Sequence, residues 1–180
     1  MTKETPNITS IVAEGPSRAG KTYWTTTQMD NESANRNQKG VITIAYNDDN
    51  ELTLTDQIAI KLFSFDSKTE VLLHIKEVNR SNITSKHTMQ CIIRNVINFA
   101  LATQTNPDVP AIKTIYWDGT NEDLSKDVIS ENANLANNEN DYKINSYRVA
   151  HKLISHEENG NPLKLRPFTV TQIELKHVEI

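Results

Sequence analysis

One stretch near the N-terminus limits the possible folds of this chain more than any other. The residues from Ile8 to Glu14 form a mainly apolar run typical of a buried strand. The next eight, Gly15-Pro-Ser-Arg-Ala-Gly-Lys-Thr22, fit the G-x-x-x-x-G-K-[ST] pattern of a phosphate-binding loop. Lys21 to Met29 continue as a predicted helix. A strand, a glycine-containing loop and a helix in this order predict an α/β fold that binds a phosphorylated ligand.

Each part of this stretch has a physical role in binding a nucleoside triphosphate. Small residues let backbone N–H groups turn toward phosphate oxygens, and the helix N-terminus adds partial positive charge. Lys21 is expected to reach the β- and γ-phosphates and to act in catalysis, and the Thr22 hydroxyl to bind Mg²⁺. The alternative is an ordinary glycine turn with a solvated Lys21. The predicted cofactors are ATP and Mg²⁺, and the predicted nucleotide-binding residues are Gly15, Pro16, Ser17, Arg18, Ala19, Gly20, Lys21, Thr22 and Tyr23.

Composition restricts the remaining possibilities. The chain has 180 residues, which suits one domain spanning residues 1–180. Its net charge of −4 argues against a surface covered by nucleic acid but allows one basic groove. No apolar run is long enough to cross a bilayer, and residues 1–7, expected as a disordered lead, show no signal peptide. The single cysteine, Cys91, and the absence of metal-ligand spacing among the histidines predict no zinc site and fit a reducing cytoplasm.

Predicted strands alternate with predicted helices along most of the chain. This alternation predicts a three-layer α/β fold with a mainly parallel sheet and helices on both faces. With the motif at residues 15–22, the chain resembles the phosphate-loop NTPases. A polar insertion is expected at residues 120–141. The expected strands are 8–14, 41–46, 57–65, 111–117 and 168–178, and the expected helices are 21–29, 67–78, 87–103 and 143–155.

Asp118 is the second candidate for phosphate chemistry. It ends the apolar run of residues 112–117, as the metal-binding aspartate does in the Walker B pattern. Asp118 is therefore predicted to hold Mg²⁺ opposite Thr22. The alternative is an aspartate that only forms an Asp-Gly turn.

The predicted helix at 143–155 is the most basic in the chain. Its Lys143, Arg148 and Lys152 are candidates for holding a nucleic-acid backbone, with Tyr147 available to stack on a base. The alternative is an amphipathic helix that only packs on the sheet. Arg148 is also a candidate arginine finger across the interface of a homo-oligomer.

The whole layout resembles the RecA-like ATPases of bacteriophages, of the Sak4-like type. Only residues 15–22 are specific, and the rest of the resemblance is order and spacing. It implies ATP hydrolysis coupled to single-stranded DNA in recombination or replication. In RecA-like ATPases the activating acid follows the next strand along the chain, which here implies Asp48, Asp49 and Glu51 as candidate general bases. A solvated acidic turn is the alternative for these three residues.

Two other classes remain open. The loop at residues 15–22 is similar to that of the thymidine kinase family, which makes a nucleotide or nucleoside kinase the first alternative. Residues 120–141 contain no arginine, however, and small kinases need an arginine-rich lid. The second alternative is a module that binds a nucleotide without hydrolysing it.

Strand order separates these classes. RecA-like ATPases have an extra strand between the phosphate-loop strand and the Walker B strand, whereas in most kinases those two strands are neighbours. We therefore predict that residues 168–175 pair with residues 8–14, which would bring Thr171 or Gln172 toward the γ-phosphate as a sensor. A place at the sheet edge is the alternative. Direct pairing of residues 112–117 with 8–14 would instead favour a kinase.

Overall fold

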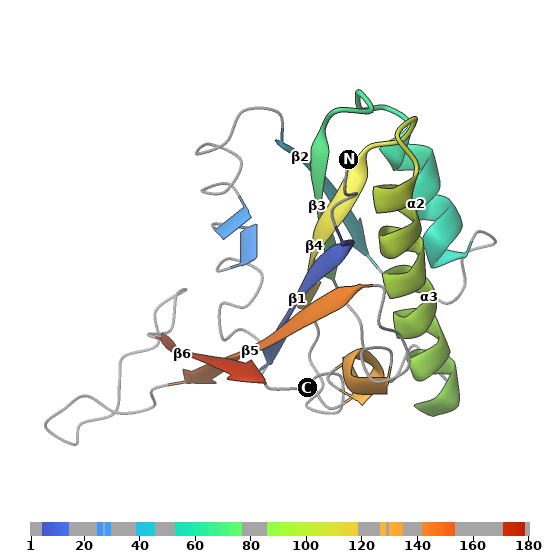
Figure 1. The fold of residues 1–180 in the computed structure, drawn as a ribbon. Coiled ribbons are helices and arrows are strands. Elements are labelled where there is room, and N and C mark those ends of the chain that lie inside the picture. The colour runs from blue at the N-terminus through green and yellow to red at the C-terminus, as the bar shows by residue number, and fades with distance from the viewer. Residues whose placement is uncertain are drawn as a thin grey trace, which may run out of the picture.

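The fold is a sheet with helices on both sides, seen here in a computed structural model (Figure 1). The structure describes residues 5–14, 25–26, 28–29, 39–45, 53–76, 86–118, 127–128, 130–134, 142–153 and 171–178. Residues 25–26 and 28–29 form a first helical segment, and residues 127–128 and 130–134 a second. The other elements, in chain order, are β1 (Asn7–Glu14), β2 (Lys39–Ala45), α2 (Leu54–Leu62), β3 (Glu70–Lys76), α3 (Lys86–Thr105), β4 (Ala111–Asp118), β5 (Lys143–Leu153) and β6 (Thr171–Val178).

The strands form one sheet in the order β2-β3-β4-β1-β5-β6. The first five strands are parallel to one another, and β6 pairs with β5 in the antiparallel direction. Strand β1 is therefore interior, with β4 on one side and β5 on the other. Because five strands run the same way, their carboxyl ends meet at one edge, which is called the carboxyl edge below.

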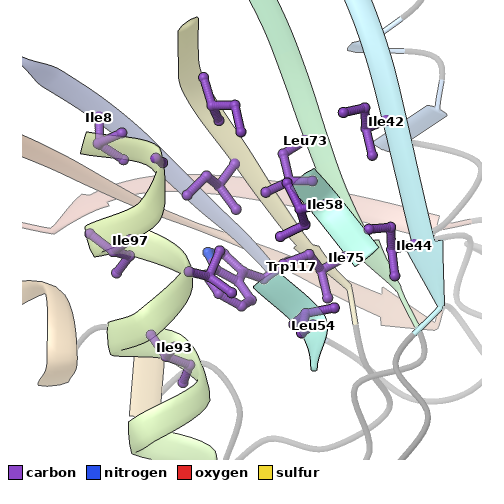
Figure 2. Packing of buried hydrophobic residues seen from close by; sticks show 14 of the residues in the cluster. Ile8, Ile42, Ile44, Leu54, Ile58, Leu73, Ile75, Ile93, Ile97 and Trp117 are labelled. Carbon is purple, nitrogen blue, oxygen red and sulfur yellow. The ribbon is translucent and has the colours of Figure 1, made fainter. Parts of the chain in front are cut away.

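Side chains on one face of the sheet pack beneath α2 and α3. They include Ile8 and Val12 of β1, together with Leu73 and Ile75 of β3. Trp117 of β4 is among the largest fully buried side chains, and Figure 2 shows it between the strands and α3. This face holds the larger of the two apolar clusters and supplies most of the hydrophobic stabilisation.

The other face carries a smaller cluster under the first helical segment. Met29 packs there with Leu72 and Tyr116, and Ile11 is partly buried against them. In Figure 1 the first helical segment (blue) lies on the side of the sheet opposite α2 and α3. The prediction of a mainly parallel α/β sheet with helices on both faces is confirmed.

Polar side chains fix the register of β1 against its neighbours. Gln104, near the end of α3, accepts from Asn7 N at 2.9 Å and donates to Asn7 O and Ile112 O. Nearer the carboxyl edge, the buried Trp117 Nε1–H donates to Ser10 Oγ at 3.0 Å. A buried indole N–H is costly unless it is paired, so the bond from Trp117 to Ser10 in particular favours a single register of β1 and β4.

Most predicted elements are confirmed and two are interchanged. The strands at 8–14, 41–46, 111–117 and 168–178 and the long helix at 87–103 are present with small shifts of their described ends. Residues 57–65, predicted as a strand, lie mostly in α2, and residues 67–78, predicted as a helix, contain β3. Thr53 is the missed signal, because its hydroxyl caps α2 by accepting from Asp56 N at 3.2 Å. β3 is buried on both faces and so lacks the alternation that identifies a strand.

The C-terminal part of the prediction is also corrected. Residues 143–153 form strand β5 rather than a helix, because they complete the ladder of β1 on its open side. The predicted pairing of 168–175 with 8–14 is wrong. Residues 171–178 form β6 at the sheet edge, paired with β5, and residues 111–118 pair directly with β1.

The buried face of α3 provides a test of this packing. The sequence pattern predicts that Cys91, Ile92, Val96, Phe99 and Ala100 face the sheet. Val96 and Ala100 are buried in the larger cluster, Ile92 and Phe99 are partly buried against it, and Cys91 is partly buried. Ile93, in contrast, is 1% exposed. We expect Ile93→Ala to lower the free energy of unfolding by about 2–5 kcal/mol through the cavity it leaves.

Ile92→Ala is the matched control, since it removes the same atoms one position away. It should lower the free energy of unfolding by clearly less than Ile93→Ala does, as measured by urea denaturation. Equal losses in the two variants would contradict this orientation of α3.

Candidate functional site

The candidate site lies where β1 ends. β1 stops at Glu14, and the sequence continues directly into the phosphate-loop pattern. Residues 15–24 lie outside the described residues, so the places of Gly15–Thr22 and Tyr23 stay predictions. Helical structure is present at residues 25–26 and 28–29, as the predicted helix of 21–29 requires. The strand before the motif and the helix after it are thus both confirmed.

The two chain connections beside the motif leave the sheet in opposite directions. After β1 the chain enters the first helical segment, whose Met29 packs in the smaller cluster. After β4 it enters the second helical segment, whose Val128 packs in the larger cluster on the other face. Ligands of open α/β sheets bind at the carboxyl ends of strands whose connections diverge in this way. Such a switch point lies between β1 and β4, directly beside the motif.

Asp118 ends β4 at this switch point. It is the register partner of Ala13, two residues before Gly15, and its side chain is 4% exposed. A carboxylate oxygen is a ligand that Mg²⁺ prefers, so the residue type and its place fit a metal ion next to the phosphate loop. Thr22 lies outside the described residues, and its approach to Asp118 stays a prediction.

His74 of β3 is a residue that the sequence analysis did not assign to the site. Its side chain is 2% exposed, and Nε2 lies 3.5 Å from Asp118 Oδ2. That is an ion-pair distance for a protonated imidazole, but Nε2 has no hydrogen bond in the described part of the chain. The sequence analysis did not place His74 beside Asp118, because it predicted residues 67–78 as a helix rather than as a strand next to β4.

Thr25 contributes a third buried polar group on the same face. It is fully buried, and its Oγ1 has no hydrogen-bond partner among the described residues. Thr25 lies one helical turn before Met29, about 6 Å nearer the carboxyl edge. His74 and Asp118 lie about 7 Å beyond the smaller cluster in the same direction along their strands.

The second helical segment is tied to α3 and β5. Arg94 Nε donates to Glu131 Oε2 at 3.1 Å, and this hydrogen bond with the neighbouring negative charge raises the pKa of Arg94. Asn132 Nδ2 donates to the buried Ser146 Oγ at 3.0 Å. Because this segment follows β4 in the chain, these contacts help to fix the path by which the chain leaves Asp118.

The candidate bases Asp48, Asp49 and Glu51 lie outside the described residues. They follow β2, which is the outer strand of the sheet, with β3 and β4 between it and β1. Three strand spacings amount to about 14 Å, so the end of β2 lies far from the end of β1, and the places of the three acids stay predictions.

The nucleic-acid candidates lie on a strand rather than on a helix. Lys143 is exposed and Tyr147 half-buried, and the two share one face of β5. Arg148 and Lys152 belong to the same strand, so the basic helix that was predicted to carry these four residues is absent.

The sensor candidates are separated from β1. Thr171 and Gln172 begin β6 and pair with Leu153 and Lys152 of β5. The direct pairing that would have brought them toward the γ-phosphate is absent, because β5 lies between β6 and β1.

Two further observations concern the described residues alone. No group of three or more histidine, cysteine, aspartate or glutamate side chains is placed there to hold a metal ion. None of the helices in this part of the chain combines the length and apolar character needed to cross a membrane.

No protein-family model and no curated protein matches this sequence. The ORC2 protein of Aeropyrum pernix, solved in ADPNP–ADP complexes, aligns over 86% of this chain and 43% of its own, with 9% identity and a TM-score of 0.47. Rif2 of Saccharomyces cerevisiae aligns over 81% of this chain and 50% of its own, with 15% identity and a TM-score of 0.40.

Rif2 in complex with the C-terminal domain of Rap1 aligns over 80% of this chain and 48% of its own, with 13% identity and a TM-score of 0.42. This chain thus spans about half the length of the structures that it matches. All three TM-scores lie below 0.5, so these similarities carry no information on the function of this chain.

The buried hydroxyl of Thr25 gives a prediction for the site. A buried hydroxyl without a partner costs about 1–3 kcal/mol, and valine has nearly the same shape without that cost. We expect Thr25→Val to raise the free energy of unfolding of the ligand-free protein, as measured by urea denaturation. Thr103→Val is the control: the Thr103 hydroxyl donates to Ala100 O and accepts from Ile112 N, so its removal should destabilise. Destabilisation by Thr25→Val would show that its hydroxyl has a structural partner.

Proposed function

We propose that this chain binds a nucleoside triphosphate at Gly15–Thr22, with Mg²⁺, and acts on its γ-phosphate. The observation that carries this proposal is the switch point between β1 and β4. There, the phosphate-loop sequence follows an interior parallel strand whose neighbour ends in the buried Asp118. A glycine turn with a solvated lysine would require neither this central position nor a buried carboxylate beside it.

The chemistry follows from the residue types. Backbone N–H groups of the loop and the start of the first helical segment attract phosphate oxygens. Lys21 neutralises charge on the β- and γ-phosphates, and Thr22 and Asp118 are the groups that would hold Mg²⁺. The metal, when bound, would neutralise negative charge on the phosphates. Burial of Asp118 keeps bulk water away from its carboxylate and limits the movement of that group.

The first test concerns Lys21. Removing its charge should lower ATP affinity at least tenfold, which corresponds to about 1.4 kcal/mol, and should abolish phosphate release. Lys21→Arg should not restore activity, because the planar guanidinium does not replace a compact ammonium in a tight loop. Lys113→Ala is the matched control, since it removes the same charge from the amino-terminal half of β4. ATP binding by calorimetry and phosphate release are the measurements, and an unchanged affinity in Lys21→Ala would exclude the site.

The strand order leaves two candidate activities. We call the strand that ends in the metal ligand the metal strand. If Asp118 is that ligand, the metal strand is β4, a direct neighbour of β1, and this observation favours a nucleotide or nucleoside kinase. If the metal strand is instead β3, then β4 lies between it and β1, as the inserted strand does in RecA-like ATPases. The acid would then be Glu77, which follows Lys76 directly and lies outside the described residues. This RecA-like arrangement, with the acid after β3, was not expected from the sequence, because residues 67–78 were predicted as a helix.

Neutral substitutions distinguish these two arrangements. If Asp118 holds the metal, Asp118→Asn should keep the fold and raise the Mg²⁺ concentration needed for nucleotide binding about 10- to 100-fold. Glu77→Gln should then have little effect, and the reverse is expected if β3 is the metal strand. Asp108→Asn is the control, since Asp108 is exposed at the other end of β4. Binding of nucleotide titrated with Mg²⁺ measures both variants.

Three assays separate the proposed classes. Phosphate release from ATP that rises with single-stranded DNA supports the RecA-like ATPase, and a requirement for a nucleoside or nucleotide acceptor supports a kinase. Binding without turnover under either condition supports a non-hydrolysing module. The same samples should be sized with and without ATP, since an arginine finger from a second copy requires an oligomer.

A further inference from the structure

His74 occupies a position that hydrophobic packing alone does not favour. It is the only polar residue in the five-residue buried run of β3, Val71–Ile75, in which leucine and isoleucine surround it. Burying an imidazole without a hydrogen bond at Nε2 costs free energy, and a leucine at the same place would not incur that cost. A structural role in the core therefore gives no reason for a histidine here.

The geometry gives such a reason on the side facing β4. His74 Nε2 lies 3.5 Å from Asp118 Oδ2, and both side chains are at least 96% buried. The other described buried side chains around them on this face are mainly apolar: Leu72, Tyr116 and Met29. In so apolar a setting, one N–H donor has a large effect on the orientation of a carboxylate. Each carboxylate has two oxygens, and His74 faces one of them.

We propose that His74 is a positioning residue that fixes the Asp118 carboxylate for the metal ion of the nucleotide site. The proposal rests on the proposed function, because it takes Asp118 as a ligand of Mg²⁺. An Nε2–H that donates to Oδ2 restricts rotation of the carboxylate and directs its other oxygen. The distance of 3.5 Å shortens to a hydrogen bond when the carboxylate is held in place, since such contacts are often long in ligand-free proteins. Groups that orient a metal ligand in this way typically change metal affinity 10- to 100-fold.

A matched pair of substitutions tests the donor separately from the packing. His74→Gln keeps an N–H donor at the position of Nε2, whereas His74→Leu keeps the volume and removes the donor. The readout is binding of Mn²⁺ in the presence of ADP, followed by electron paramagnetic resonance, so that it does not depend on turnover. Thr114→Val is the control, because Thr114 lies on the same strand and face but about 13 Å from Asp118.

We expect His74→Leu to weaken Mn²⁺ binding 10- to 100-fold while ADP affinity without metal stays within about twofold. His74→Gln should remain within about threefold of the parent protein. The Leu variant should also be no less stable than the parent toward urea, since leucine suits the apolar setting.

The outcomes distinguish this inference from the function on which it rests. If the parent protein binds neither nucleotide nor Mn²⁺ with ADP, the proposed function itself fails. If the parent protein binds both, but His74→Leu leaves Mn²⁺ affinity unchanged, His74 does not position the metal ligand. Equal weakening in the Gln and Leu variants would show that the imidazole acts through its shape rather than through its donor, and would also overturn the proposal.

Discussion

The double pairing of β1 is the constraint on which the rest of the structure depends. β1 forms one parallel ladder with β4 and another with β5, so its backbone N–H and C=O groups are paired within the sheet. Its side chains are covered on both faces, by the larger cluster beneath α3 and by the smaller cluster around Met29. A strand held on four sides has little freedom to slip or rotate, and the residue at which it ends is fixed in space.

This constraint explains how a candidate ligand site can arise without special side-chain arrangements within the sheet. Parallel strands bring Glu14 and Asp118 to the same edge, and connections that diverge to opposite faces leave room between them. The hydrogen bond from Trp117 to Ser10 stabilises the register one residue before Asp118. The position of Asp118 is therefore a consequence of backbone pairing and core packing, and the buried His74 adjusts only the direction of its carboxylate.

The sequence predicted the parts of the fold in which local pattern and tertiary role agree. An apolar run before the glycine motif predicts β1, and the long amphipathic stretch at 87–103 predicts α3. The prediction failed where the pattern was ambiguous: Ile58, Ile60 and Leu62 alternate like a strand, although Leu54, Ile58 and Leu62 also share a helical face. β3 was missed because a strand covered on both faces shows no alternation, and with it the contact between His74 and Asp118 was missed. Strand order cannot be read from local patterns, because it depends on pairings between distant residues.

The placement of β1 also has a consequence for how the chain folds during synthesis. Its contacts span long stretches of sequence: the buried hydrogen bond from Trp117 to Ser10 joins residues 107 apart, and the exposed hydrogen bond from Asn145 to Asn7 joins residues 138 apart. β1 thus acquires its two partners only after β4 and β5, more than a hundred residues further along the chain, have been made. Non-local pairing of this kind slows folding and leaves an apolar strand exposed to neighbouring chains in the meantime. The segment that organises the finished sheet is, until late in synthesis, the one most in need of protection from aggregation.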